Sequence, residues 1–139
     1  MNRSMAAMCV VLAVWAFSRP ATAHHSFAAE YDRNKPVTLT GPVTKVEWTN
    51  PHVYFHIAVK DSAGATTTWA IEGGAPNTLY RAGWRRESIK VGDVLTVHGH
   101  LARDGTNLAN MRTAILADGR EVLGGQQDGG PSVPKRPGR

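Results

Sequence analysis

Residues 37–59, VTLTGPVTKVEWTNPHVYFHIAV, decide the fold of this 139-residue chain. Apolar residues alternate with polar ones from Val37 to Val43, and the alternation changes phase before Val46 and Trp48, as expected of a bulged, curved strand. The Thr49-Asn50-Pro51 segment forms a corner. Beyond the corner, one face carries Val53, Phe55, Ile57 and Val59, and the other carries His52, Tyr54, His56 and Ala58. The stretch therefore predicts two strands of a curved hairpin with one face in a core.

The later segments predict three more strands and one short helix. A strand over 66–72 places Thr67, Trp69 and Ile71 inward, and Pro76 then opens a helix that Gly83 ends. Leu95, Val97, Gly99 and Leu101 share a face of the fourth strand, and residues 108–116 form the fifth. Three strands, a short helix and two strands match the OB-fold. We therefore predict an all-β, small, five-stranded OB-like barrel with one short helix between strands 3 and 4, over residues 36–123.

The first 23 residues have the features of a cleaved export signal. Arg3 precedes an apolar run from Met5 to Phe17 that is short for a membrane span, and Ala21-Thr22-Ala23 is a small-x-small cleavage site. We expect cleavage after Ala23 and a periplasmic or secreted protein. No transmembrane segment is expected after cleavage. An uncleaved anchor is the alternative.

The mature chain would have no cysteine, because Cys9 lies in the signal. Removing 23 residues from 139 leaves 116, enough for one modest core that packing must stabilise without disulfides. The formal charge falls from +5 to +3 when Arg3 and Arg19 leave with the signal. Part of the remaining excess lies in residues 124–139, which we predict to be a disordered basic tail rich in Gly and Pro. The nearly neutral domain argues against nucleic acid as a partner.

Residues 24–35, HHSFAAEYDRNK, form an arm or a short helical turn before the first strand, with Phe27 and Tyr31 as its apolar anchors. This HHSF start, together with the phrases VEWTNPH, WAIEGGAPN and VGDVLTVHGHLARDG, resembles an uncharacterised family of small exported bacterial proteins, a domain of unknown function. The resemblance covers residues 24–120. It implies an export signal and a compact β-domain, and it implies no activity.

The six histidines all follow the predicted cleavage site. Cleavage after Ala23 would make His24 the N-terminal residue, so that its amine and its imidazole could bind one ion together. Copper favours such nitrogen ligands, and a third nitrogen from another histidine would complete a T-shaped site. His25 is adjacent and could compete. The alternative is that the residues after the cleavage site are only a hydrophilic N-terminus without a metal-binding role.

Other histidines are candidates for the third nitrogen or for a separate site. His52 and His56 lie on one strand face, but their Cα atoms are expected roughly 13 Å apart, so at most one of them joins His24. His98 and His100 are expected roughly 6.6 Å apart on one face and could share a metal. The alternative is that they decorate an exposed face. The candidate metal ligands are thus His24, His25, His52, His98 and His100.

The sequence contains no motif that predicts catalysis. Glu72, at a strand end before Gly73-Gly74, could be a ligand or a base, but a solvated edge residue is the more common case. No second acid, nucleophile elbow or phosphate loop accompanies it. Arg81, Arg85 and Arg86 form a basic cluster that either meets an anionic ligand or lipid headgroup or is a solvated face.

These observations predict a non-enzymatic, exported binding protein of the bacterial envelope. Copper is the most concrete candidate ligand; an unknown envelope protein or small molecule is the other. A structural or interaction module without metal is the alternative, and oligonucleotide binding is a third reading that export and near-neutral charge oppose.

Overall fold

A computed structural model describes residues 27–125. The predicted signal, His24, His25 and residues 126–139 lie outside this range. The elements, in chain order, are α2 (Phe27–Glu30), β1 (Tyr31–Glu47), β2 (Tyr54–Lys60), β3 (Thr66–Glu72), α3 (Pro76–Arg81), the 3-10 turn η1 (Arg86–Ser88), β4 (Val94–Ala102), β5 (Leu108–Asn110), β6 (Thr113–Ile115) and β7 (Glu121–Leu123).

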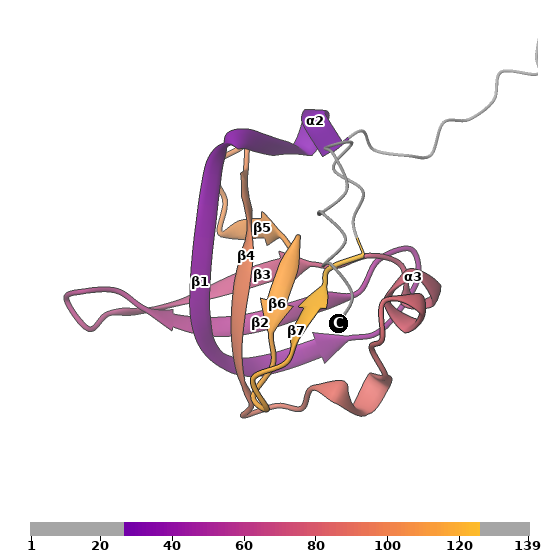
Figure 1. The fold of residues 1–139 in the computed structure, drawn as a ribbon. Coiled ribbons are helices and arrows are strands. Elements are labelled where there is room, and N and C mark those ends of the chain that lie inside the picture. The colour runs from indigo at the N-terminus through magenta and orange to yellow at the C-terminus, as the bar shows by residue number, and fades with distance from the viewer. Residues whose placement is uncertain (1–26, 126–139) are drawn as a thin grey trace, which may run out of the picture.

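Strand β1 bends so strongly that its two halves pair with different strands (Figure 1). The half up to Pro42 pairs with β4, and the half from Val43 to Glu47 pairs with β2. The register shifts between Val43 and Lys45, where the change of phase in the sequence predicted a bulge. Gly41 lies at the bend, and a Cβ there would meet the carbonyl oxygen of Ala58 at 2.1 Å. The bend therefore depends on a residue without a side chain.

Five strands close into a barrel in the order β1-β2-β3-β5-β4, with β4 pairing back to β1. All these pairs are antiparallel except β3 with β5, which is parallel. Strands β6 and β7 extend the sheet from β4 outside the closed barrel. The predicted all-β, five-stranded barrel with a short helix between strands 3 and 4 is confirmed.

The predicted fifth strand, residues 108–116, is in fact two strands. Residues 108–110 pair with β3 and β4 as β5, and residues 113–115 pair farther along β4 as β6. Both segments run antiparallel to β4, and the register shifts by one residue across Met111 and Arg112, where the pairing with β3 also ends. The β7 strand is an addition to the predicted elements, because its three residues are too few to show an alternating pattern.

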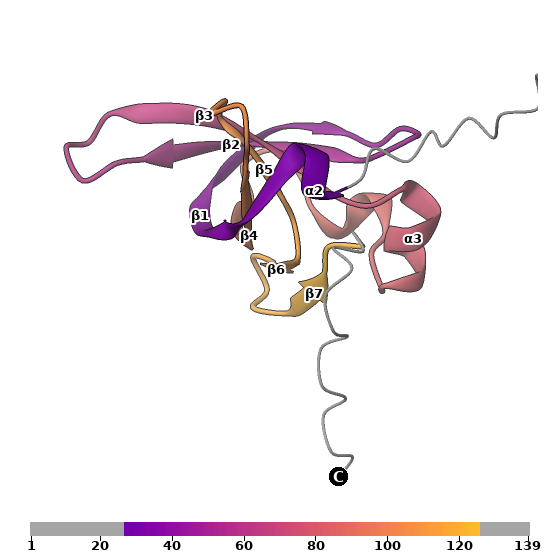
Figure 2. The same ribbon diagram turned by 90° about the horizontal axis from the view of Figure 1, so that it is seen from above.

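The N-terminal segment joins the barrel earlier than the predicted boundary at residue 36. Residues 27–30 form α2, a single turn, and β1 begins at Tyr31. Tyr31 is 1% exposed and pairs with Ala102 of β4. Figure 2, a view from above, shows α2 lying across the end of the barrel. Residues 31–35 thus belong to the folded domain and not to an arm.

The core agrees with the alternation in the sequence over most of the strands, but not at the end of β4, where Leu101 is only half-buried, nor at the start of β3. Trp69 is only partly buried and Thr67 is exposed, although both were predicted to face inward. The reason is visible in Figures 1 and 2, where the β2–β3 hairpin projects beyond the barrel. The fully or nearly fully buried apolar residues include Val43, Trp48, Val53, Phe55, Ile57, Ile71, Leu79, Trp84, Leu95, Val97, Met111 and Ala114.

The chain is still bound to the barrel at Gly124, the first residue of the predicted tail. Its N–H donates to the carbonyl of Arg112 at 2.7 Å, and its carbonyl accepts from the N–H of Gly74 at 2.8 Å. A Cβ at this position would meet the carbonyl oxygen of Met111 at 1.8 Å. The domain therefore extends beyond residue 123.

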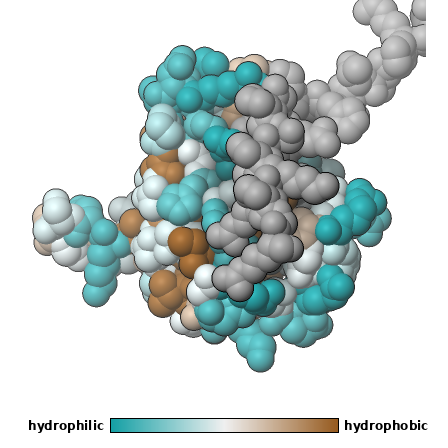
Figure 3. All heavy atoms as spheres, in the orientation of Figure 1, coloured by the Kyte–Doolittle hydropathy of each residue, from teal (hydrophilic) through white to brown (hydrophobic). Residues whose placement is uncertain are grey.

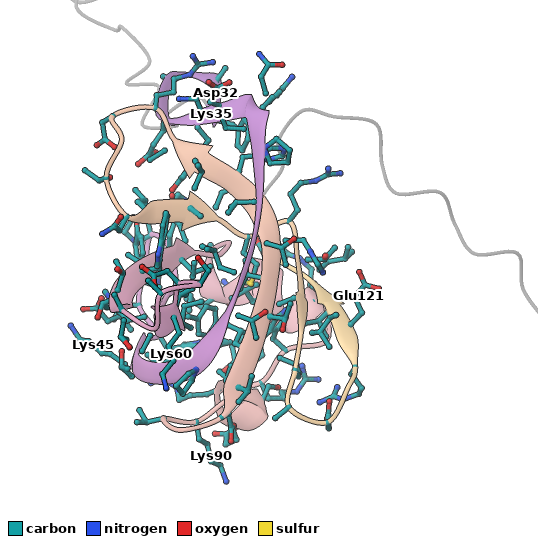
Figure 4. All side chains as sticks on the ribbon, turned by 90° about the vertical axis from the view of Figure 1, so that its left-hand side faces the viewer. Asp32, Lys35, Lys45, Lys60, Lys90 and Glu121 are labelled. Atoms are coloured by element: carbon teal, nitrogen blue, oxygen red, sulfur yellow. The ribbon has the colours of Figure 1, made fainter. Side chains whose placement is uncertain are left out.

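The labelled charged side chains Lys45, Lys60, Lys90 and Glu121 point away from the barrel in Figure 4. Apolar residues break a mostly polar surface only in separate patches on the face seen in Figure 3. Within residues 27–125, no helix combines the length and the apolar character that a membrane crossing requires.

Candidate functional site

A buried carboxylate lies at the end of the barrel that α2 covers. Glu72 is 2% exposed, and it accepts a hydrogen bond from the hydroxyl of Tyr31. Its other oxygen pairs with Nδ1 of His52. The interpretation of Glu72 as a solvated edge residue is therefore wrong. The carboxylate is tolerated inside because two polar side chains from distant parts of the chain satisfy it.

The strand pairing explains why these side chains meet. Glu72 is the last residue of β3, between Tyr54 on β2 and Asn110 on the parallel β5. Tyr31 starts β1, the strand that closes the barrel with β4. The barrel thus brings the end of β3 and the start of β1 to one rim, where Glu72 is central.

Burial raises the pKa of both tyrosines in this cluster. For Tyr54 burial comes first, the charge of Glu72 adds to it, and the pKa rises to about 12. For Tyr31 burial and the hydrogen bond to Glu72 raise the pKa well above its ordinary value. Both phenols therefore stay protonated at neutral pH, and the Tyr31 hydroxyl acts as a donor to Glu72.

His52 lies in the corner between β1 and β2, next to Val53, whose backbone is hydrogen-bonded to the chain that follows β3. The Asn50–Pro51 peptide bond is cis, and Val53 makes two backbone hydrogen bonds, one with Gly73 and one with Gly74. The His52 side chain remains 40% exposed, while its partner Glu72 is 3% exposed. The ring is therefore oriented by a carboxylate at Nδ1 and still accessible from outside.

This arrangement suits a histidine that binds a ligand through its second nitrogen. Metal-binding histidines commonly donate their other ring N–H to a carboxylate, which fixes the tautomer and the ring orientation. The same pair could also orient a general base, because a carboxylate at Nδ1 likewise holds the histidine of catalytic triads. Among residues 27–125, no group of three or more His, Cys, Asp and Glu side chains is placed to hold a metal ion.

His56, on the same face of β2, belongs to a separate pair. Its Nε2 lies 2.7 Å from Glu47, which also accepts from Lys45 at 2.6 Å. The hydrogen bond from Lys45, followed by that from His56, holds the pKa of Glu47 below its usual value. His56 therefore takes part in a surface ion-pair network and is not joined to His52.

His98 and His100 line one open pocket of about 500 Å³ on the outer face of β1, β4 and β6. Nδ1 of His98 lies 3.0 Å from the Thr38 hydroxyl oxygen. His100 is 7% exposed, so the expectation that both decorate an exposed strand face does not hold for it. The sequence predicted that the two side chains share a face, but not that α2 covers one of them.

The Arg81, Arg85 and Arg86 cluster is partly used within the fold. Arg85 donates to the carbonyls of Trp84 at 2.6 Å and Tyr80 at 3.2 Å, and it lies over the Tyr80 ring. Arg86 donates to the carbonyl of Trp48 at 3.4 Å. Two of the three arginines thus bind α3 and the corner after β1.

Sequence reasoning missed Tyr31 and Asn110 as members of the polar rim. The sequence marks Tyr31 only as an apolar anchor and places Asn110 within a strand. The available signal is weak: a tyrosine shortly before a long strand and a buried-strand asparagine both require polar partners. Which partners they have depends on the closure of the barrel.

Comparison with known proteins supports the resemblance seen in the sequence. The model of a family of unknown function (DUF6152) matches residues 11–111. No curated protein matches the chain. The match covers most of the chain and includes Tyr31, His52, Glu72 and His100. The chain therefore belongs to this family of unknown function, DUF6152.

Proposed function

We propose that the protein is exported, that its signal is removed after Ala23, and that the mature chain binds copper without catalysing a reaction. In this proposal His24 supplies its amine and its imidazole, and His52 supplies the third nitrogen. The observation that carries it is the pairing of the half-exposed His52 with the buried Glu72, itself held by Tyr31. A histidine oriented in this way has its Nε2 left for an external ligand.

The distance along the chain is compatible with this site. His24 precedes Phe27 by three residues, a span of at most about 11 Å. The centroid of the Phe27 ring lies 5.5 Å from that of the Tyr31 ring, and Tyr31 binds the same carboxylate as His52. Phe27 thus lies at the rim that carries Glu72, which supports a site within reach of the N-terminal histidines. His25 could replace His24 as the imidazole ligand.

The ligand types favour copper over other metals. A mature chain without cysteine offers nitrogen and oxygen only, and Cu(II) binds nitrogen ligands most tightly among the divalent first-row metals. Residues 27–125 hold no complete metal cluster, so a ligand from residues 24–26 is a requirement of the proposal.

The test is calorimetric Cu(II) titration of the mature protein, with its N-terminus verified by sequencing. An extra Gly before His24 keeps every imidazole but separates the amine from its chelate partner. His52→Asn keeps an N–H near Glu72 and removes Nε2. Each change should weaken binding of one Cu(II) at least tenfold, and His56→Gln, on the same face of β2, should leave it unchanged.

Other outcomes would contradict parts of the proposal. Equal copper affinity with and without the extra Gly would exclude the N-terminal chelate. Loss of binding only in a His98, His100 double variant would place the site on β4. No copper binding by any form would favour the interaction module, and partners would then be sought by affinity capture from the envelope.

A further inference from the structure

The outer face of the β1–β4 pair carries a ladder of cross-strand side-chain pairs that is incomplete at one end. Thr40 and Thr96 face each other with their hydroxyl oxygens 3.0 Å apart, and the Thr38 hydroxyl oxygen lies 3.0 Å from Nδ1 of His98. The next pair along the ladder is Pro36 with His100. Proline has no side-chain donor or acceptor, so His100 lacks the cross-strand bond that His98 makes.

His100 is therefore a buried imidazole with an unused nitrogen. The Phe27 ring covers it edge-on at a centroid distance of 5.7 Å, and its Nδ1 has no hydrogen-bond partner among residues 27–125. Its backbone N–H is satisfied by Oδ1 of Asn110 at 2.6 Å. A buried polar atom without a partner is destabilising, so a nitrogen in this state is suited to a hydrogen bond from a bound ligand.

The pocket beside this ladder is rich in hydrogen-bond donors, and no carboxylate is among the described residues that line it. Arg112 lines it together with His98, His100, Thr38 and Thr113. The backbone N–H of Arg112 donates to the carbonyl of His98 at 2.9 Å, which holds the arginine next to the histidines. Thr113 pairs with His98 across β4 and β6.

We infer that this pocket binds an oxyanion, the phosphate or carboxylate group of a small molecule. An arginine fork, a threonine hydroxyl and two imidazoles are groups that recognise such oxygens. A volume of about 500 Å³ exceeds what a bare ion needs and lies in the range of small-molecule sites.

The site is independent of the proposed copper site. It uses β1, β4, β6 and the β5–β6 link, and it involves neither His24, His52 nor Glu72. The two proposals can therefore fail separately, and only copper bound by His98 and His100 would contradict both.

The test uses the mature full-length protein, titrated with glycerol 3-phosphate, inorganic phosphate and succinate at constant ionic strength. Amide NMR shifts report the location, and calorimetry reports the affinity. We expect saturable binding of at least one probe, with the largest shifts at Gly99, Arg112 and Thr113. The preferred probe distinguishes a phosphate ester from free phosphate and from a carboxylate.

Arg112→Gln should weaken binding tenfold or more, because a charge-assisted hydrogen bond is lost. Arg81→Gln, an exposed arginine on α3, is the matched control and should bind as the wild type does. His100→Phe should also weaken binding without lowering the melting temperature, because it removes the unpaired nitrogen and retains the packing against Phe27.

Three results would overturn the inference. The first is equal affinity of the Arg112→Gln variant and the wild type. The second is an equal loss in Arg81→Gln, which would indicate general charge attraction. The third is that none of the three anions binds saturably, and Cu(II) binding that depends on His98 would then make the pair a metal site.

Discussion

The hydroxyl of Tyr31 donates a hydrogen bond to the carboxylate of Glu72, although 41 residues separate them in the chain. The bond joins the start of the first barrel strand to the end of the third. It also fixes the carboxylate that orients His52. One contact thus connects closure of the barrel with the geometry of the candidate site.

Tyr31→Phe should destabilise the protein by about 1.5–3 kcal/mol, because a buried carboxylate loses a donor while the ring remains. Denaturant unfolding measures the change. Tyr80→Phe is the control. Tyr80 is 40% exposed, and the variant keeps the ring contact with Trp48, so it should lose almost no stability. Equal losses in the two variants would show that the Tyr31 hydroxyl adds nothing.

The two rim tyrosines should resist ionisation in the folded protein. The chain has three tyrosines, and the pKa of Tyr31 and that of Tyr54 are both raised by burial, the latter to about 12. In the unfolded chain they ionise near pH 10, so the stability due to these protonated phenols is complete below that pH. It should decline as pH rises from about 10 toward 12 and beyond.

Absorbance of tyrosinate and melting temperature, followed across the same pH range, test this expectation. The Tyr31→Phe variant should show a shallower decline of stability above about pH 10 than the wild type. Ionisation of all three tyrosines near pH 10 in a protein that is still folded would contradict the buried rim.

Gly99→Ala should destabilise the barrel, although alanine normally improves on glycine inside a strand. A Cβ at Gly99 would lie 1.8 Å from the carbonyl oxygen of Asn110, which belongs to the neighbouring β5. The backbone must move to accommodate this Cβ, so we expect the free energy of unfolding to fall by about 1–3 kcal/mol or more. At Gly73 the tightest contact of a Cβ is the movable end of Met111 at 3.1 Å, so Gly73→Ala should cost less. Thermal unfolding of both variants decides the order.

Two C-terminal deletions should reveal how much the docking of Gly124 contributes to stability. Removing residues 124–139 eliminates the two hydrogen bonds of Gly124 with Arg112 and Gly74, whereas removing 126–139 retains them. The longer deletion should therefore have the lower melting temperature, because it loses the stability that one or two hydrogen bonds contribute. Identical melting temperatures would show that Gly124 does not contribute, as a tail boundary at residue 124 predicts.

Much of the fold could be predicted from local patterns. The bulge after Val43, the inward face of Phe55 and Ile57, and the helix opened by Pro76 follow from periodicity and backbone chemistry. The break in the fifth strand was not predicted, although its buried residues change phase, from Ala109 and Met111 to Ala114 and Leu116. The register with β4 shifts by one residue at this point, and the parallel pairing with β3 ends before it, a combination that only the closed barrel shows.

By itself, the sequence determined the strand alternation, the barrel class and the histidines that could bind a ligand, since each depends on neighbouring residues. Only the tertiary structure decided which of those polar residues are buried and what they meet. Local sequence presents Glu72 as an edge residue and His100 as a surface residue, whereas β1, β3 and α2 enclose them. Burial and partnership arise between segments far apart in the chain, so no local pattern encodes them.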